Sequence, residues 1–320
     1  MNLTKNHLGV LCLTILMGFL ALISSAEAQS GFHLDLQSQR VSWSQLSFHA
    51  KNFWVEVSTE IQIRFLQASE LDALLLASPR GIPIKLKNSQ ASELTINTAI
   101  NPRFRTPVKI HNRTWFDPTD GSALGCVRLR RGEDDFKKMY RFTEQGIFRQ
   151  RIEPKDKREA SLEPDKWKDI KDTFYPYNAK QLNCPLVSEG SLLIYLLSAA
   201  PVSKINDPVS LCVWGKRQLH RVTVQREGTY PVSVGSIIKR QQDELGKEER
   251  ISAVKIAVKA EPMESDLKAA ENFSFLGLQQ DISIYIDPTT QLPIQVSGII
   301  PTLGKAELKL NEIKWASKSD

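Results

Sequence analysis

Hydrophobic and polar residues alternate along much of the chain with the period of two that a β-strand imposes. Over residues 53–65, every second side chain is apolar or threonine, and those between are mostly polar. Residues 43–50 have the same pattern, and a turn over 50–52 would join the two stretches in a hairpin. Because antiparallel sheets with one solvated face produce such alternation, we predict a mainly antiparallel β protein. The pattern recurs at 209–213, 222–224, 254–258, 282–286, 294–296 and 306–310.

Helices are predicted at few places. The strongest candidate is 188–200, which is apolar nearly all round and ends at Pro201. A helix that is apolar on every side is buried. We therefore predict a strongly curved antiparallel sheet or open barrel with this one buried apolar helix and few others. Shorter candidates lie at 68–78, with Ser69 as N-cap, and at 263–272.

The first 28 residues have the organisation of an export signal. An uncharged apolar run covers residues 8–23, and Ala26-Glu27-Ala28 matches a signal-peptidase site. We expect cleavage after Ala28 and a periplasmic location. The run is shorter than the roughly 20 residues that a permanent transmembrane helix needs, so an uncleaved anchor is the less favoured interpretation. No other long apolar stretch follows, and we expect no transmembrane span in the mature chain.

Two β portions are predicted beyond the signal. Residues 153–186 carry three prolines and alternate acidic with basic side chains, which is typical of a surface excursion or linker. This divides the chain into an N-terminal β portion, 29–152, the charged excursion, 153–186, and a C-terminal portion with the helix, 187–320. We expect the two β portions to form one continuous architecture.

Charge and cysteine content narrow the functional classes. The net charge is +6, from 42 Lys and Arg against 36 Asp and Glu, and the signal removes one of each sign. So small an excess on an exported chain does not indicate a nucleic-acid partner. The mature chain keeps Cys126, Cys184 and Cys212 without a C-x-x-C motif. One disulfide of undetermined pairing and three buried thiols are equally compatible with this.

Two turns share the sequence Asp-Pro-Thr, at 117–119 and 287–289, and a strand follows each. Two ordinary hairpins explain this more simply than a duplication, because turn residues come from a small set. The order of turn, strands, buried helix and closing hairpin nevertheless resembles a family of exported bacterial β-rich proteins of unknown function. The resemblance covers roughly residues 105–315, and in the closing hairpin it rests on Tyr285, Asp287, Leu292-Pro293-Ile294 and Gly304.

The resemblance implies a fold similar in outline to the half-barrel of periplasmic lipoprotein carriers, an open curved sheet around helices with an apolar cavity. The family's motifs are structural rather than catalytic. Its buried helix often begins with an acid, at a place where this chain has Ser191.

No catalytic constellation is evident. The histidines of the mature chain are scattered, without an H-E-x-x-H pair, and there is no glycine-rich phosphate loop. The acidic triplet 133–135 could bind a cation or act on a glycan, but a charged hairpin tip explains it better. We therefore expect no enzyme activity, no metal and no cofactor.

Two groups of residues are candidates for binding. Inward apolar positions could line a cavity for acyl chains: Phe53, Val55, Val57, Ile61, Leu192, Leu193, Tyr195 and Leu196. Basic residues over 128–158 could form a cationic face for anionic glycan or lipid head groups, since Arg matches phosphate and carboxylate: Arg128, Arg130, Lys137 and Arg141. A solvated outer face is the simpler alternative for the second group.

These observations favour an exported, periplasmic, non-catalytic binding or carrier protein for a lipid-like or amphiphilic ligand. An envelope assembly or structural protein that acts through protein contacts at exposed sheet edges is the main alternative. A cell-wall glycan hydrolase is less favoured, because it would need two carboxylates converging in a cleft.

Overall fold

The computed structural model describes residues 34–179, 181–202, 205, 207–234, 249–263, 273–301 and 304–316. The described residues belong to one compact unit, Phe32–Asp320. The predicted signal, its cleavage site and nearly all of the predicted helix 263–272 lie outside the described residues.

All strands belong to one 15-stranded sheet, which confirms the predicted mainly β class. The strands are β1 (Trp43–Lys51), β2 (Val55–Gln67), β3 (Gln90–Pro102), β4 (Val108–Phe116), β5 (Ala123–Arg131), β6 (Phe136–Thr143), β7 (Gly146–Glu153), β8 (Asp169–Pro176), β9 (Val187–Glu189), β10 (Val209–Trp214), β11 (Leu219–Val234), β12 (Glu249–Pro262), β13 (Gln280–Ile286), β14 (Pro293–Ile300) and β15 (Gly304–Trp315). The helices are α2 (Ala68–Leu71), α3 (Lys157–Ala160) and α4 (Leu193–Ala199), with 3-10 turns η1 (Ser38–Arg40), η2 (Pro164–Lys166), η3 (Gln181–Asn183) and η4 (Gly190–Leu192).

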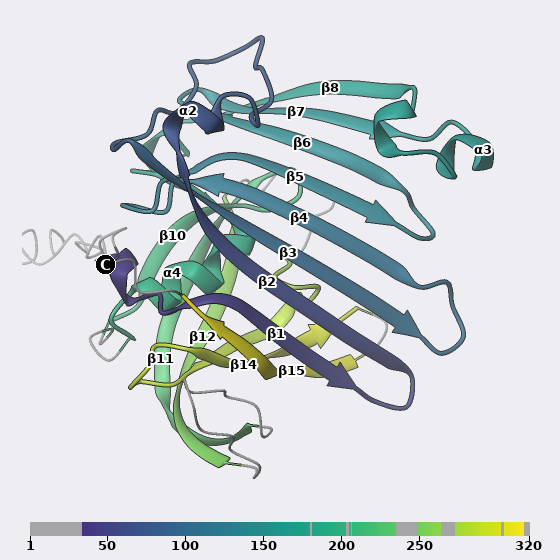
Figure 1. Cartoon of the computed structure of the whole chain (residues 1–320). Helices are drawn as coiled ribbons and strands as arrows, with labels where there is room; N and C mark the ends of the chain where they lie inside the picture. Colours follow the sequence, from purple (N-terminus) through teal and green to yellow (C-terminus); the bar gives the residue numbers. More distant parts are fainter. Residues whose placement is uncertain are drawn as a thin grey trace, which may run out of the picture. The chain divides into compact units, whose positions relative to one another are not determined.

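The strand order places consecutive strands side by side, with one break. The order is β8-β7-β6-β5-β4-β3-β2-β1-β15-β14-β13-β12-β11-β10-β9, so β1 and β15 pair in the middle (Figure 1). The break falls between β8 and β9, which are consecutive in sequence but form opposite edges. Only the segment from Pro176 to Val187 joins them. Because a chain spans at most about 3.5 Å per residue, the sheet must curve until its two edges approach each other.

The buried helix α4 lies inside this curve (Figure 1). All its residues are buried, in one hydrophobic core with side chains from both halves of the sheet. Together, η4 and α4 confirm the helix predicted at 188–200, although it starts two residues later. A second, smaller core lies where α2 and the segment after it cover Trp115 and Leu124.

The two Asp-Pro-Thr turns have the same hydrogen bonds. Asp117 Oδ1 accepts from the Thr119 amide at 2.9 Å, and Asp287 Oδ1 accepts from the Thr289 amide at 3.0 Å. The first turn binds the helix, because the Tyr195 hydroxyl donates to the carbonyl of Pro118 at 3.1 Å. The second binds the chain just after the helix, where the Val202 amide donates to Gln291 Oε1 at 3.4 Å.

Two predicted elements differ from the structure. The helix predicted at 68–78 is only α2, and its capping box uses Gln67 and Glu70 instead of Ser69. The segment 153–186, predicted as an excursion or linker, contributes the edge strand β8, which pairs with β7 along its whole length. Its alternating charges concealed a strand because an edge strand is largely solvated.

One disulfide is present among the described residues, between Cys184 and Cys212, and Cys126 is free and buried. The sequence left this pairing open. Cys184 precedes β9 and Cys212 lies opposite Val187 of β9, so the bond fastens the start of this edge strand to β10.

We predict that the Cys184→Ser/Cys212→Ser variant unfolds at lower urea concentration than the oxidised protein. A disulfide that closes a loop of 28 residues constrains the unfolded chain, and its loss costs about 3 kcal/mol of unfolding free energy. A reductant should lower the stability of the parent protein, and it should leave the stability of the double variant unchanged. A parent protein insensitive to reductant would contradict the pairing.

Candidate functional site

The predicted apolar interior is a filled core. Leu192, Leu193 and Tyr195 have no exposed surface, and Leu196 has 2%. A void wide enough for a water molecule would leave exposed area on the side chains that line it, so none of water size adjoins these three residues. The helix thus occupies the space in which an acyl chain would have to lie.

Of the four strand residues predicted to face the interior, three are buried and one is exposed. Val55, Val57 and Ile61 are buried in the same core as α4. Phe53 is 65% exposed, which corrects its assignment to the interior. The reason is local, because Asn52 Oδ1 accepts from the amides of Trp54 and Val55 and forms a turn, so that β2 begins only at Val55.

The four predicted basic residues do not share one face, which corrects the second prediction. Arg128 pairs with Lys138 across β5 and β6, so both side chains lie on the same face of the sheet, and Arg130 shares it. Lys137 and Arg141 lie on the opposite face, and Lys137 forms an ion pair there with Asp165. A single strand sends alternate residues to opposite faces, so neighbours in sequence cannot build one charged surface.

A denser cluster of basic and aromatic residues occupies the inner face, and we call it the cationic site. Across β6 and β7, Lys138 lies opposite Arg151 and Tyr140 lies opposite Arg149. Each basic group lies over an aromatic ring, at 4.0 Å for Lys138 and Phe136 and at 5.2 to 5.4 Å for the three arginines. The members are Arg128, Phe136, Lys138, Tyr140, Arg149, Arg151, Tyr175 and Trp214.

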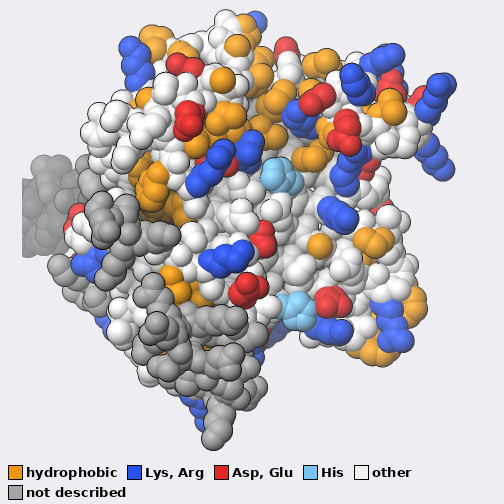
Figure 2. Space-filling view, in the orientation of Figure 1, with side chains coloured by type: hydrophobic (Ala, Val, Ile, Leu, Met, Phe, Trp, Pro, Cys, Tyr) orange, Lys and Arg blue, Asp and Glu red, His pale blue; other side chains and the backbone are white. Residues whose placement is uncertain are grey.

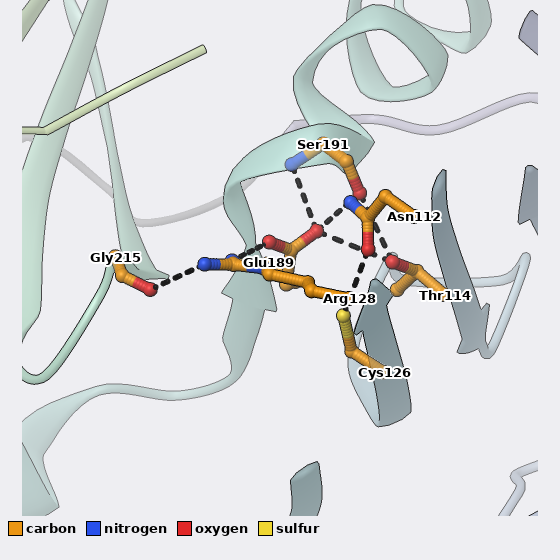
Figure 3. Close-up of polar contacts among 7 residues, drawn as sticks. All are labelled: Asn112, Thr114, Cys126, Arg128, Glu189, Ser191 and Gly215. Carbon is orange, nitrogen blue, oxygen red and sulfur yellow. Dashed lines mark hydrogen bonds and ion pairs between the residues drawn. The ribbon is translucent and has the colours of Figure 1, made fainter. Parts of the chain in front are cut away.

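Arg128 joins this face to the other end of the sheet (Figure 3). Its guanidinium forms an ion pair with Glu189, at the end of β9, and donates to the carbonyl of Gly215 at 3.2 Å. Glu189 is 1% exposed and also accepts from the Ser191 amide at 2.8 Å and the Thr114 hydroxyl at 3.3 Å. A buried ion pair needs such additional hydrogen bonds to offset its desolvation.

The acid at the start of the buried helix is therefore Glu189. The resemblance implies an acidic residue at the start of this helix, where the sequence has Ser191. The structure shows Glu189 as N-cap of η4, two residues earlier, where its carboxylate accepts the Ser191 amide. A carboxylate at this position satisfies amides that the helix leaves unpaired.

Cys126 borders the ion pair but has no nucleophilic character. Its thiol is buried and donates to Asn112 Oδ1 at 3.1 Å (Figure 3). Burial and the neighbouring carboxylate of Glu189 raise the pKa of this thiol to about 12. A thiol that stays protonated at neutral pH is inert, so Cys126 is a buried structural residue of this cluster.

Two basic side chains of the cationic site lack a compensating carboxylate. Arg128 pairs with Glu189 and Arg151 pairs with Glu153. Lys138 and Arg149 have no carboxylate within ion-pair distance in the part of the chain that the structure describes. Burial lowers the pKa of Lys138 to about 7, together with the charges of Arg151, Arg128, Arg149 and Arg217.

Several buried donors of the same site also lack an acceptor among the described residues. They are Tyr140 Oη, Arg149 Nε, Arg151 Nε and Trp214 Nε1. Arg149 is 8% exposed, and its Nη2 donates to the hydroxyl of Thr173 at 3.1 Å. A buried donor without an acceptor costs about 1–3 kcal/mol. These buried donors lie out of reach of a ligand, whereas Lys138 and Arg151 are partly exposed and carry the charge that a phosphate or a carboxylate matches.

Lys138, Arg149 and Arg151 belong to the basic run 128–158 but were not among the predicted site residues, and Glu189 was not predicted at all. A signal existed for Lys138, because alternation over 136–142 places it on the face of Phe136 and Tyr140. Nothing local could indicate Glu189, since its partner Arg128 is 61 residues away.

We predict that Glu189→Gln lowers the unfolding free energy by about 3–5 kcal/mol, because it leaves the Arg128 guanidinium without its buried carboxylate. The measurement is urea unfolding followed by circular dichroism. Arg128→Met/Glu189→Leu should lose clearly less than the single variant, since no charge is then stranded. The control is Lys171→Gln, at an exposed ion pair with Asp169, where about 0.5 kcal/mol or less is expected. Equal effects of Glu189→Gln and this control would contradict the account.

Comparisons with known proteins give a structural similarity and no activity. No model of a protein family matches the sequence, and no curated protein matches it. A crystal structure of a β-barrel-like protein of domain of unknown function DUF1849, from Brucella abortus, is similar over 90% of this chain and 100% of its own. The two share 7% sequence identity with a TM-score of 0.43. Among the described residues, no helix has the length and apolar character needed to span a membrane.

Proposed function

We propose that the protein is exported to the periplasm, where it binds an amphiphilic ligand without catalysis and holds its anionic head group at the cationic site. The mature chain would begin at Gln29. The export signal in the sequence supports the location, and the chemistry of the inner sheet face supports the ligand class.

The observation that carries this proposal is the uncompensated ammonium of Lys138. It lies beside three arginines of the same face, within a group of buried donors that have no acceptor among the described residues. Such an arrangement destabilises the free protein, and proteins retain such costs mainly at functional sites. A bound phosphate or carboxylate would compensate the charge of Lys138, which is partly exposed.

An amphiphile is favoured over a free anion because aromatic rings surround the basic groups. Phe136 and Tyr175 offer partly exposed apolar surface next to the guanidinium groups, so a head group and the adjoining part of a chain can bind together. The acyl chain would lie along this surface, since α4 fills the interior.

Absence of catalysis is supported by the state of the nearby reactive groups. Burial keeps the Cys126 thiol protonated, and the Glu189 carboxylate is bound by Arg128, Ser191 and Thr114. Neither is available to attack a substrate or to move a proton.

Assembly through protein contacts is the second candidate function. β8 is an edge strand with one partner, and Ile170 on it is 54% exposed. Exposed edges with apolar side chains pair readily with other chains. Binding at the cationic site is favoured because it accounts for the uncompensated charge, which an edge contact leaves unchanged.

We predict that Lys138→Met weakens binding of dihexanoyl phosphatidylglycerol at least tenfold, because the variant removes the group that the phosphate compensates. Isothermal titration calorimetry measures the affinity, with inorganic phosphate and glycerol phosphate as further ligands to separate the head group from the chain. Lys137→Met is the matched control, since this residue lies on the opposite face of the same strand. If the parent protein bound none of the three ligands, or if both variants bound like the parent, the proposal would be wrong.

Dihexanoyl phosphatidylglycerol is a phosphodiester, and the affinity of the protein for it should rise by up to about tenfold as pH falls from 8 to 6. The pKa of Lys138 is lowered to about 7, so most of its ammonium is deprotonated at pH 8 and restored at pH 6. Only the protonated form attracts the anion, and the phosphodiester itself keeps its charge over this range. Calorimetric titrations at both pH values test this, and Lys138→Met should show no such rise. An affinity independent of pH in the parent protein would contradict the assignment.

A further inference from the structure

Three large aromatic side chains are exposed at the tips of two adjacent hairpins. Phe53 and Trp54 form the turn between β1 and β2, and Phe104 lies in the turn between β3 and β4. Their exposed fractions are 65%, 56% and 73%. The turns are joined, because the Arg103 amide donates to the carbonyl of Trp54 at 2.9 Å. We call these three residues the aromatic cap.

The cap is a contiguous surface. The ring centroids of Phe53 and Trp54 are 4.9 Å apart, and those of Trp54 and Phe104 are 6.2 Å apart. The guanidinium of Arg103 lies over Phe53 at 4.3 Å. In Figure 2, hydrophobic side chains gather beside basic ones at the lower right, where these hairpin tips lie in Figure 1. An exposed aromatic cluster of this kind marks an interaction surface.

The charge around the cap is positive. Arg103 and Arg105 are exposed in the turn between β3 and β4, and Lys51 is exposed at the end of β1. The nearby acid, Glu56, is already bound by His49 and Lys51. Burial of the rings in an apolar phase would therefore leave the basic groups facing any negative charge at its boundary.

We propose that the aromatic cap docks on an anionic lipid bilayer, with Phe53, Trp54 and Phe104 in the interfacial layer and the basic side chains on the lipid phosphates. Aromatic rings with one polar edge, Trp above all, favour the boundary between head groups and acyl chains. Each basic residue near an anionic surface adds attraction that salt screens.

The geometry favours a membrane over a protein partner. The rings lie on protruding turns, which can enter a fluid surface without a matching groove. The neighbouring β5–β6 tip limits the docking area, because it carries acidic residues that an anionic surface repels. Two of them are already engaged, Asp134 by Arg130 and Asp135 by Arg131.

This inference does not depend on the proposed function. The aromatic cap lies on hairpin tips of β1–β4, whereas the cationic site lies on β5–β8 and β10. Substitutions at one place leave the other unchanged, so the two proposals can fail separately.

Vesicle co-sedimentation tests the proposal with a chain that begins at Gln29, which leaves out the apolar run and keeps the compact unit 32–320. Vesicles of phosphatidylglycerol and phosphatidylethanolamine should bind the protein, and phosphatidylcholine vesicles should bind it at least tenfold more weakly. The triple variant Phe53→Ser/Trp54→Ser/Phe104→Ser should lose at least tenfold in affinity for the anionic vesicles. Arg103→Gln/Arg105→Gln should lose affinity mainly at low salt.

The matched control is Phe65→Ser, which removes an aromatic side chain of 57% exposure from the opposite end of β2 and should bind like the parent.

Trp54 is the most exposed of the six tryptophans, so its fluorescence should shift to the blue on vesicles and be quenched by spin-labelled lipids. Circular dichroism confirms that each variant is folded. Equal binding of the parent and the triple variant, or no binding of the parent to anionic vesicles, would overturn the proposal. Loss of binding in Phe65→Ser would also overturn it.

Discussion

The ion pair between Arg128 and Glu189 joins the two ends of a sheet that the strand order leaves open. β8 and β9 are its edges, and this buried contact ties β9 and the turn after β10 to the inner face of β5. The same closure places Trp214 beside Tyr140 and Tyr175, with ring centroids 6.3 and 5.2 Å apart. If the contact between Arg128 and Glu189 were broken, both charges would stay buried without a partner, and β9 would no longer be held against the inner face of β5. The disulfide, the two Asp-Pro-Thr turns and α4 all support this arrangement.

Closure also explains where the proposed ligand can bind. The helix α4 fills the interior, so the basic and aromatic side chains of the cationic site lie where the two edges of the sheet meet. Three arginines and Lys138 are held there by strand pairing, although their mutual repulsion and the unpaired buried donors oppose folding. A rigid sheet closed by an ion pair and a disulfide can carry that cost, and an anion would reduce it. The aromatic cap is a separate feature, because hairpin tips lie beyond the last pairs of the strands and take no part in closure.

Sequence patterns were informative wherever the cause was local. Alternation predicted β1, β2 and the closing strands, and apolar residues on all sides predicted the buried helix at 188–200. Local turn chemistry also explains the error at Phe53, because Asn52 starts a turn that alternation alone does not reveal. The pairing of Cys184 with Cys212 and of Arg128 with Glu189 depends on distant strands meeting, which no local pattern encodes. Alternation separates Lys138 from Lys137 and Arg141, but only the pairing of β5, β6 and β7 shows that the face of Lys138 also carries Arg128 and Arg151.

The central claim is that closure of the sheet creates a site with an uncompensated ammonium that an anion neutralises. Carbon NMR of the lysine Cε atoms, with Lys138→Met to assign the signal, measures the pKa of this group directly. The account predicts a value near 7 in the free protein, far below that of an exposed lysine, and a clear rise when the phosphodiester head group is added. A value near 10.5, unchanged by the ligand, would contradict it.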